Sequence, residues 1–163
     1  MRNADAQWTL DFEIKGEERT QALAEAARIL KDWGLTMPPV DPLTIDFGLR
    51  NFRRIGEIEY WIVNDRDRNY CGKFLLLFEN QRCPRHQHRM KDETFFIVKG
   101  TVAMEADDRE FLMQEGDTYQ MAPGVVHTFA AVGGPALVLE VSLPSIPGDN
   151  IFEDRRIGRD GVL

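Results

Sequence analysis

The sequence predicts an all-β protein: an antiparallel double-stranded β-helix, or jelly-roll barrel, preceded by one N-terminal α-helix. Three observations lead to this fold class. About eight short runs rich in β-branched, aromatic and aliphatic residues follow residue 57 at regular intervals. Clusters of Gly, Pro, Asn and Asp separate these runs, as in successive β-turns. Before them, a single segment has apolar residues at helical spacing.

The helix is expected over residues 17–33. Its apolar residues, among them Ala26 and Leu30, recur every three or four positions, and the charges at its two ends suit the helix dipole. Gly34 follows as a C-terminal stop. Three prolines within residues 37–42 then exclude regular structure, which predicts a linker or a lid.

The apolar runs that follow predict the strands of one barrel. The expected strands span residues 58–63, 73–78, 93–98, 101–105, 110–113, 118–121, 127–131 and 136–141. The end of the chain is rich in Pro, Gly, Asp and Arg, which fits either a disordered tail or a segment that folds over the barrel mouth. We expect one domain, with an N-terminal strand and helix extension (1–57), a barrel (58–143) and a tail over the barrel mouth (144–163).

Composition and charge limit the partners of the protein. The formal net charge is −7 and the basic residues form no long run, so neither nucleic acid nor an anionic membrane is an expected partner. No apolar stretch is long enough to span a bilayer, and Met1–Thr9 contain no apolar core of a signal peptide. With only two cysteines, Cys71 and Cys83, the chain is expected to be cytoplasmic.

Three histidines and a glutamate form the most informative pattern in the sequence. His86 and His88 are separated by one residue, so in a strand both imidazoles point to the same face. Glu93 follows after a short loop that returns its carboxylate to them, and His127 follows a Pro-Gly turn and is positioned to approach from across the barrel. The alternative is three histidines with separate structural roles. Since the chain has only these three and all fit one pattern, a metal site is the stronger interpretation.

This pattern resembles the two sequence motifs of the cupin superfamily. The matching residues are His86, His88, Glu93 and Gly100 for the first motif, and Gly116, Pro123, Gly124 and His127 for the second. The resemblance implies the cupin form of the jelly-roll barrel and one bound divalent cation. Three imidazoles and one carboxylate suit Mn, Fe, Co, Ni or Zn, and they leave one or two coordination positions free for water or substrate.

Two charged residues within apolar strands are candidates for proton transfer. Glu140 shares a strand face with small residues such as Ala136, so it is expected to point into the barrel, where a carboxylate needs a partner or a function. The alternative is a strand-edge residue in a surface ion pair. Lys73 is the only charge in the run 73–78, and it either lies at an exposed strand end or reaches the cavity.

Four segments further resemble the D-lyxose isomerase family of cupins: residues 70–73, 83–88, 91–95 and 149–157. The resemblance implies an enzyme that interconverts an aldose and its ketose, such as D-lyxose and D-xylulose, with a divalent ion that is usually manganese. It implies Glu140 as the base that carries a proton between C1 and C2, with Lys73 as a cation that assists. It also implies that Asp149 and Arg156 bind the distal hydroxyls of the sugar.

Other functions remain open at this point. A metal-dependent dioxygenase uses the same kind of ligand set, but it can work with an apolar cavity, whereas an isomerase needs proton-transfer groups beside the metal. A non-catalytic sugar-binding cupin is a third possibility. In each case a homodimer that pairs an outer sheet edge is expected, because open edges of a barrel are often covered in this way.

Overall fold

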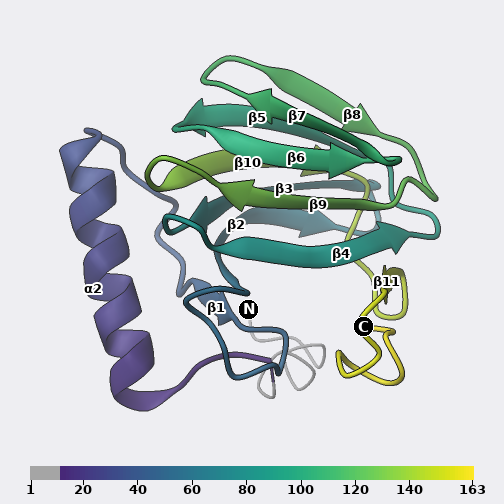
Figure 1. Cartoon of the computed structure of the whole chain (residues 1–163), viewed down its shortest axis with the longest axis horizontal. Coiled ribbons are helices and arrows are strands. Elements are labelled where there is room, and N and C mark those ends of the chain that lie inside the picture. The colour runs from purple at the N-terminus through teal and green to yellow at the C-terminus, as the bar shows by residue number, and fades with distance from the viewer. Residues whose placement is uncertain (1–11) are drawn as a thin grey trace.

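The computed structural model describes residues 12–163, so Met1–Thr9 and the start of the expected N-terminal extension lie outside the described residues. Figure 1 shows two stacked sheets with one helix beside them. The elements are α2 (Gly16–Asp32), β1 (Leu43–Ile45), β2 (Glu57–Asp65), β3 (Tyr70–Leu77), β4 (Arg82–His88), β5 (Glu93–Lys99), β6 (Val102–Ala106), β7 (Arg109–Met113), β8 (Thr118–Met121), β9 (His127–Ala131), β10 (Ala136–Ser142) and β11 (Asn150–Phe152). The all-β prediction with one N-terminal helix is confirmed for this part of the chain.

The strands form a six-stranded sheet in the order β1-β2-β3-β10-β5-β8 and a five-stranded sheet in the order β11-β4-β9-β6-β7. Neighbouring strands of both sheets run antiparallel. Strands far apart in sequence become neighbours: in the β3–β10 pair, Lys73 lies opposite Glu140. This exchange of strands between distant parts of the chain gives the jelly roll that the turn pattern predicts.

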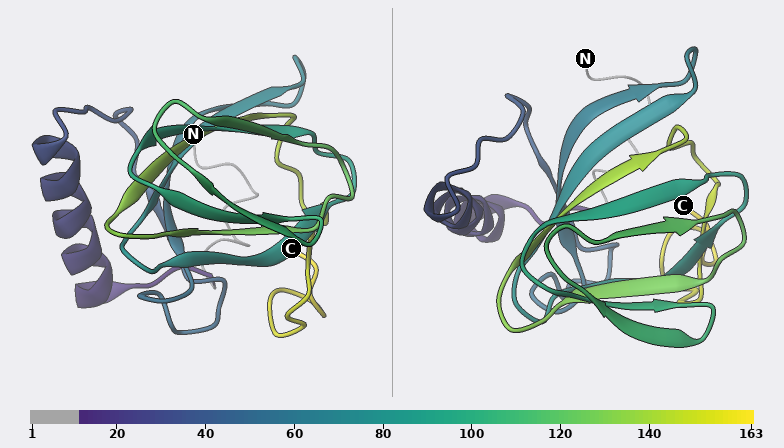
Figure 2. Two further views of the ribbon diagram at one scale, coloured as in Figure 1. Left: turned by 45° about the horizontal axis from the view of Figure 1, so that its top comes forward. Right: turned by 90° about the horizontal axis from the view of Figure 1, so that it is seen from above.

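Two hydrophobic cores lie on opposite faces of the six-stranded sheet. The inner core fills the space between the sheets, and the outer core lies between the sheet and α2. On β3, Leu75 belongs to the inner core and Leu76 to the outer one, because successive side chains of a strand point to opposite faces. Figure 2 shows α2 along the outside of the barrel. The sheet is therefore buried on both sides over much of its area.

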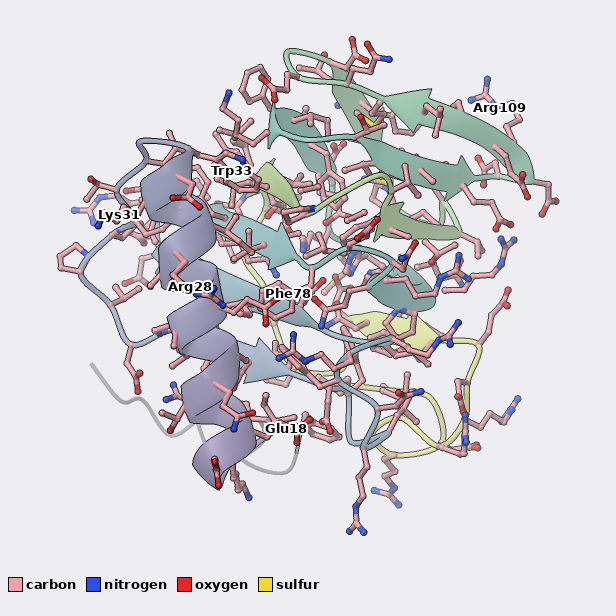
Figure 3. All side chains as sticks on the ribbon, turned by 60° about the vertical axis from the view of Figure 1, so that its left-hand side comes forward. Glu18, Arg28, Lys31, Trp33, Phe78 and Arg109 are labelled. Carbon is pink, nitrogen blue, oxygen red and sulfur yellow. The ribbon has the colours of Figure 1, made fainter. Side chains whose placement is uncertain are left out.

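The helix contacts the sheet through small and aliphatic residues, with Ala22, Ala26 and Leu30 buried. Figure 3 views it from outside, with Arg28 and Lys31 on its exposed face. It spans Gly16–Asp32, one residue earlier at each end than expected, and Gly34 follows in the left-handed region at φ 68°. Residues 37–42 contain no helix or strand, as their prolines predict.

Two strands and most of a third were missed by the sequence prediction. β1 and β11 have only three residues each, too few for a periodic pattern. β4 contains Pro84, which lowers its apparent strand propensity, so only its His86–His88 end was expected to be extended. Both β1 and β11 pair with longer neighbours, β2 and β4, which supply the hydrogen bonds that define them.

The C-terminal segment folds against the barrel. β11 pairs with β4, and the backbone N–H of Leu163 donates to the carbonyl of Asn150 at 3.0 Å. Ile157 is fully buried in the inner core. Of the two conformations expected for this segment, the structure has the ordered one. Within residues 12–163, no helix combines the length and apolar character needed to cross a membrane.

Candidate metal centre and polar pocket

Three strands bring the predicted ligands together. His86 and His88 lie on β4, Glu93 opens β5, and His127 opens β9 directly opposite His86 in the antiparallel pair. One ligand atom from each of the four residues lies within 4.8 Å of all the others, and all four side chains are buried. Residues separated by up to 41 positions therefore converge on one point, as the sequence pattern predicts.

Backbone contacts determine which imidazole nitrogens face that point. Nδ1 of His86 lies 2.8 Å from the carbonyl of Pro84, and Nδ1 of His127 lies 3.0 Å from the carbonyl of Val125. A carbonyl oxygen only accepts, so both Nδ1 atoms carry the hydrogen and both Nε2 atoms keep a lone pair. Burial, followed by the nearby His127 and His88, holds the pKa of His86 well below its ordinary value. His86 is thus neutral, as a metal ligand must be.

The centre contains polar atoms that need a partner. Nε2 of His127 lies 3.0 Å from Oε1 of Glu93, and Nε2 of His88 lies 3.3 Å from the same oxygen. Among the described residues, His127 Nε2 and Glu93 Oε1 are buried without a hydrogen-bond partner. Such atoms are costly in a protein interior unless something binds them. A divalent cation meets this need, and the cluster forms a candidate divalent metal site.

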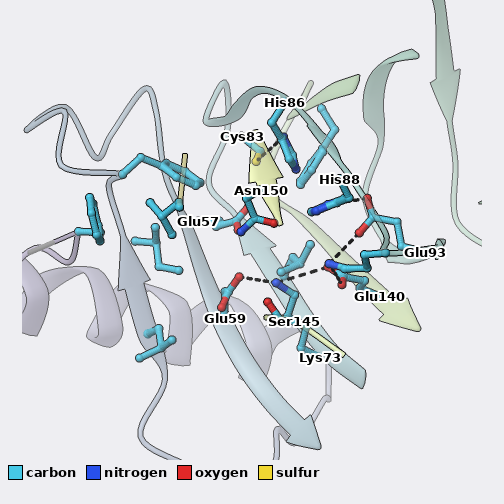
Figure 4. Close-up of a pocket in the computed structure, with 18 of the residues that line it drawn as sticks. Glu57, Glu59, Lys73, Cys83, His86, His88, Glu93, Glu140, Ser145 and Asn150 are labelled. Atoms are coloured by element: carbon cyan, nitrogen blue, oxygen red, sulfur yellow. Dashed lines mark hydrogen bonds and ion pairs between the residues drawn. The ribbon is translucent and has the colours of Figure 1, made fainter. Parts of the chain in front are cut away.

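The cluster opens onto a pocket between the two sheets. Its wall includes His86, His88 and Glu93 from the cluster. The six-stranded sheet contributes charged side chains to the same wall, as Figure 4 shows. The C-terminal segment contributes Ser145, Asn150, Phe152 and Leu163. The pocket therefore combines a metal centre, buried charges and a partly apolar cover.

Buried acidic and basic groups alternate along the pocket (Figure 4). Lys73 Nζ lies 2.6 Å from Glu59 Oε1 and 3.4 Å from Glu140 Oε2. Lys91 Nζ lies 2.6 Å from Glu140 Oε1 and 3.0 Å from Glu93 Oε2. We call these five residues the charge row. It links the metal centre to the opposite side of the pocket without an interruption.

Glu140, Lys73 and Lys91 favour one another's ionised forms. Burial alone would favour the neutral forms. For Glu140, the ammonium groups of Lys73 and Lys91 overcome burial and lower the pKa of the carboxyl group. For Lys73 and Lys91, burial is likewise overcome, first by Glu140, and the pKa of each ammonium group is raised. The Glu140 carboxylate thus lies between two ammonium groups that stabilise its ionised form.

The two oxygens of Glu140 differ in their contacts. Oε1 accepts from Lys91 at 2.6 Å and from the hydroxyl of Ser142 at 2.9 Å. Among residues 12–163, Oε2 has only the longer contact of 3.4 Å with Lys73. A carboxylate oxygen has two lone pairs, so Oε2 retains capacity for another hydrogen. This is the arrangement that a general base requires.

Both proton-transfer candidates face the pocket. Glu140 is buried on the same face of β10 as Val138, which belongs to the inner core, whereas Leu137 on the other face belongs to the outer core. Lys73 shares a face of β3 with Leu75, so it lies within the barrel and not at an exposed strand end. Both Glu140 and Lys73 therefore point into the barrel, and neither lies at an exposed strand edge or end.

The two residues expected to bind distal hydroxyls have other contacts. Arg156 is exposed, with 76% of its side chain accessible, and it pairs with the neighbouring Asp154. Asp149 is buried, but it accepts hydrogen bonds from the backbone N–H groups of Met90 at 2.8 Å and Lys91 at 3.2 Å. Neither residue lines the pocket. Arg156 points to solvent and Asp149 is engaged by the loop before β5, so the binding of distal hydroxyls by these two residues stays a prediction.

Sequence reasoning missed three charged residues of the pocket wall. Glu57 and Glu59 alternate with apolar residues on β2, a pattern that usually indicates carboxylates on the solvent side. Here the apolar residues face α2, which leaves the carboxylates facing the pocket. Lys91 precedes Glu93 by two positions in a short loop, and its only signal was its place in the segment 91–95. Its burial depends on contacts that spacing alone does not reveal.

The chain is similar to known families and proteins. Residues 76–142 match the family model described as Cupin domain. The chain is 28% identical to the D-lyxose ketol-isomerase of Cohnella laeviribosi, over 92% of this chain and 98% of that protein. It is 31% identical to the D-lyxose ketol-isomerase of Thermofilum sp. (strain ex4484_79), over 70% of this chain and 77% of that protein. A D-lyxose/D-mannose isomerase of Thermosediminibacter oceani is 30% identical over the same shares.

Solved structures show the same fold at lower identity. The L-ribose isomerase of Cellulomonas parahominis with L-ribose superposes with a TM-score of 0.73 at 18% identity, covering 93% of this chain and 97% of that one. The L-ribose isomerase of Geodermatophilus obscurus gives a TM-score of 0.73 at 15% identity, covering 88% of this chain and 94% of that one. The likeness covers more of the chain than residues 76–142, which match the family model.

Proposed function

Since the chain belongs to the cupin family of D-lyxose ketol-isomerases and is a sugar isomerase, we propose that it interconverts D-lyxose and D-xylulose, or a closely related pentose pair, by proton transfer between C1 and C2. One observation carries the proposal. Glu140, a buried and ionised carboxylate, keeps Oε2 available for a proton in the pocket that contains the metal ligands. Carbon-to-carbon proton transfer needs such a base at the reacting end of the sugar.

In the proposal, His86, His88, Glu93 and His127 hold one divalent cation, and manganese is the ion we propose. A bound divalent cation supplies Lewis-acid polarisation of the C1 and C2 oxygens of the sugar. Oε1 of Glu93 would bind the cation, while Oε2 lies 3.0 Å from Lys91 Nζ. That contact fixes the orientation of the carboxylate, as hydrogen bonds to metal ligands commonly do.

Glu140 is proposed to move the carbon-bound proton. From the aldose, Oε2 accepts the C2 proton, and the electron pair of that bond forms the C1–C2 double bond of an enediol as O1 gains a proton. The same carboxyl group then gives its proton to C1 while the C2 hydroxyl loses its proton and becomes the ketone. We assign the exchange between O1 and O2 to Lys91, because its Nζ lies between Glu93 and Glu140.

The rest of the pocket is proposed to bind and enclose the sugar. Asn150 and Ser145 offer polar groups at the wall contributed by the C-terminal segment. Phe152 and Leu163 offer apolar surface that keeps water from the reacting carbons. Lys73, 3.4 Å from Glu140 Oε2, would keep this base ionised until the sugar arrives. The binding of distal hydroxyls by Asp149 and Arg156 stays a prediction beside these assignments.

The alternatives have less support. A pocket with two buried lysines and two further carboxylates beside the metal ligands suits proton transfer better than reaction with dioxygen. A binding module without catalysis has no need of a base with an open lone pair. The curated relatives named above are isomerases. We also propose a cytoplasmic homodimer paired through an outer sheet edge, to be tested by light scattering of the purified protein.

Isotope exchange tests the function. The manganese-loaded protein is incubated with D-lyxose and other pentoses in deuterated water and followed by NMR. We expect D-xylulose to form from D-lyxose with solvent deuterium at C1 or C2. Glu140→Gln should lower the rate by about 10²–10⁴-fold while metal content is retained. Glu110→Gln, on the exposed face of β7, is the control and should behave as wild type. Oxygen consumption with a diketone or flavonol, without isotope exchange in any pentose, would contradict the proposal.

A further inference from the structure

Glu57 is a buried acid in the pocket wall whose role is not explained by the charge row. It lies on β2 and is only 4% exposed. It lines the pocket, yet its Oε2 atom has no hydrogen-bond partner among residues 12–163. A buried polar atom without a partner costs free energy, and within a pocket the missing partner is expected to come from a ligand. Glu57 is therefore oriented toward something that the protein itself does not supply.

Burial and the neighbouring Glu59 favour the neutral form of Glu57. Glu59 is fully occupied: Oε1 accepts from Lys73 at 2.6 Å and Oε2 accepts from the indole N–H of Trp61 at 2.7 Å. Burial, followed by repulsion from the Glu59 carboxylate, raises the pKa of Glu57 well above its ordinary value. Glu57 is thus held in its neutral form, and Oε2 remains without a partner.

The position of Glu57 indicates which part of a sugar it would contact. In Figure 4, Glu57 and Glu59 lie on one side of the pocket and Glu93 lies on the other. Lys73 lies between the two sides. A sugar that has C1 and C2 at Glu140 and the metal ligands must extend away from Glu93. Its distal carbons then approach β2. A hydroxyl is the group on those carbons that donates to a neutral oxygen acceptor.

We propose that Glu57 binds the hydroxyl at the distal end of the sugar through Oε2 and thereby selects substrates by chain length. This inference rests on the proposed function for the direction in which the sugar lies, and it adds a specificity-determining residue to it. Because Glu57 is neutral in this role, a glutamine at the same position keeps the hydrogen bond to the ligand, since its amide oxygen accepts from the sugar. A leucine keeps the volume and loses this bond.

Binding of polyols tests the proposal without requiring turnover. D-arabinitol has the carbon skeleton of D-lyxose without the carbonyl, and erythritol lacks its distal carbon and hydroxyl. We would measure calorimetric affinities of both for the manganese-loaded wild type, Glu57→Gln, Glu57→Leu and the control Glu110→Gln, with the melting temperature and metal content of each. Wild type, Glu57→Gln and Glu110→Gln should prefer the pentitol by about tenfold, and Glu57→Leu should lose this preference.

The outcomes separate the two proposals. A preference for the pentitol that persists in Glu57→Leu, or its absence from the wild type, overturns the role of Glu57. A folded, metal-loaded wild type that shows the preference but never exchanges deuterium into a pentose retains the role of Glu57 and overturns the isomerase proposal. If Glu57→Leu does not fold, a loss of the preference in Glu57→Gln also overturns the neutral-acceptor role, because that variant keeps a neutral oxygen acceptor at the same position.

Discussion

Lys91 Nζ lies 2.6 Å from Oε1 of Glu140, with both side chains buried. The same ammonium group lies 3.0 Å from Glu93, so one cation contacts both the proposed base and a predicted metal ligand. Removing it would leave two carboxylates without their shared counter-charge. Such a loss is severe in a protein interior, where charges are tolerated only with partners.

Lys91→Met should therefore affect both stability and pH dependence. Loss of one partner of a buried ion pair should lower the free energy of unfolding by about 3–5 kcal/mol, measured by urea denaturation. Lys91 helps to hold the pKa of Glu140 below its ordinary value, so without it that pKa rises. A base is active above its pKa, so the acidic limb of the kcat/KM profile should move to higher pH. An unchanged acidic limb would contradict the assignment of Glu140 as the base.

Removal of the metal should destabilise the folded protein. The unpartnered Glu93 Oε1 and His127 Nε2 lose their ligand when a chelator is added. Because only the folded state brings the four ligands together, added manganese at about 100 times its dissociation constant should stabilise the protein by roughly 2.7 kcal/mol. Differential scanning calorimetry with chelator and with manganese checks this result. Equal melting temperatures in the two conditions, in protein with the ligands intact, would argue against a metal site.

Asp149→Asn should weaken metal binding without a change in the ligands themselves. Asp149 accepts from the N–H groups of Met90 and Lys91, and its Oδ2 lies 3.8 Å from Nδ1 of His88. An asparagine has one acceptor in place of two, so the loop before Glu93 loses a bond. We expect the manganese affinity to fall by about 10–100-fold in a competition assay with a metal indicator. Asp154→Asn, in the same segment, is the matched control and should retain the wild-type affinity.

Substitutions of two neighbouring leucines on β3 should have similar effects on stability but different effects on catalysis. Leu76 belongs to the outer core under α2, and Leu75 belongs to the inner core and lines the pocket. Either substitution by alanine should lower the free energy of unfolding by about 2–5 kcal/mol, because each removes a fully buried side chain. Only Leu75→Ala should also change KM for the sugar when both are assayed well below their melting temperatures. Equal kinetic effects of the two variants would contradict the division into two cores.

The sequence predicted the convergence of the metal ligands because the relevant information is local. The spacing of His86 and His88 fixes one strand face, and Glu93 is only one short loop away. His127 was found because the chain has no other histidine to consider. Turn residues likewise revealed the long strands. The extra strands β1 and β11 escaped because their three residues depend on hydrogen bonds from partners elsewhere in the chain.

The wall of the pocket was harder to predict for a physical reason. Alternation on β2 correctly indicates two faces, but it does not say which one meets water. The usual assignment, apolar side inward, fails here because α2 covers the outside of the sheet and takes the apolar face. Glu57 and Glu59 were therefore overlooked, while Glu140 was found because its strand face carries small apolar neighbours. Which face of β2 meets the pocket depends on α2, which is distant from β2 in the sequence but adjacent to it in the structure.

The charge row also determines the electrical balance of the cavity. Its three carboxylates outnumber its two ammonium groups, so without an ion the wall has one surplus negative charge. With a dication the surplus becomes one positive charge. A neutral sugar leaves that surplus in place, and a proton that passes from the sugar to Glu140 stays within the cavity, so the total charge does not change. The surplus positive charge thus remains available to attract negative charge as it develops on the sugar oxygens.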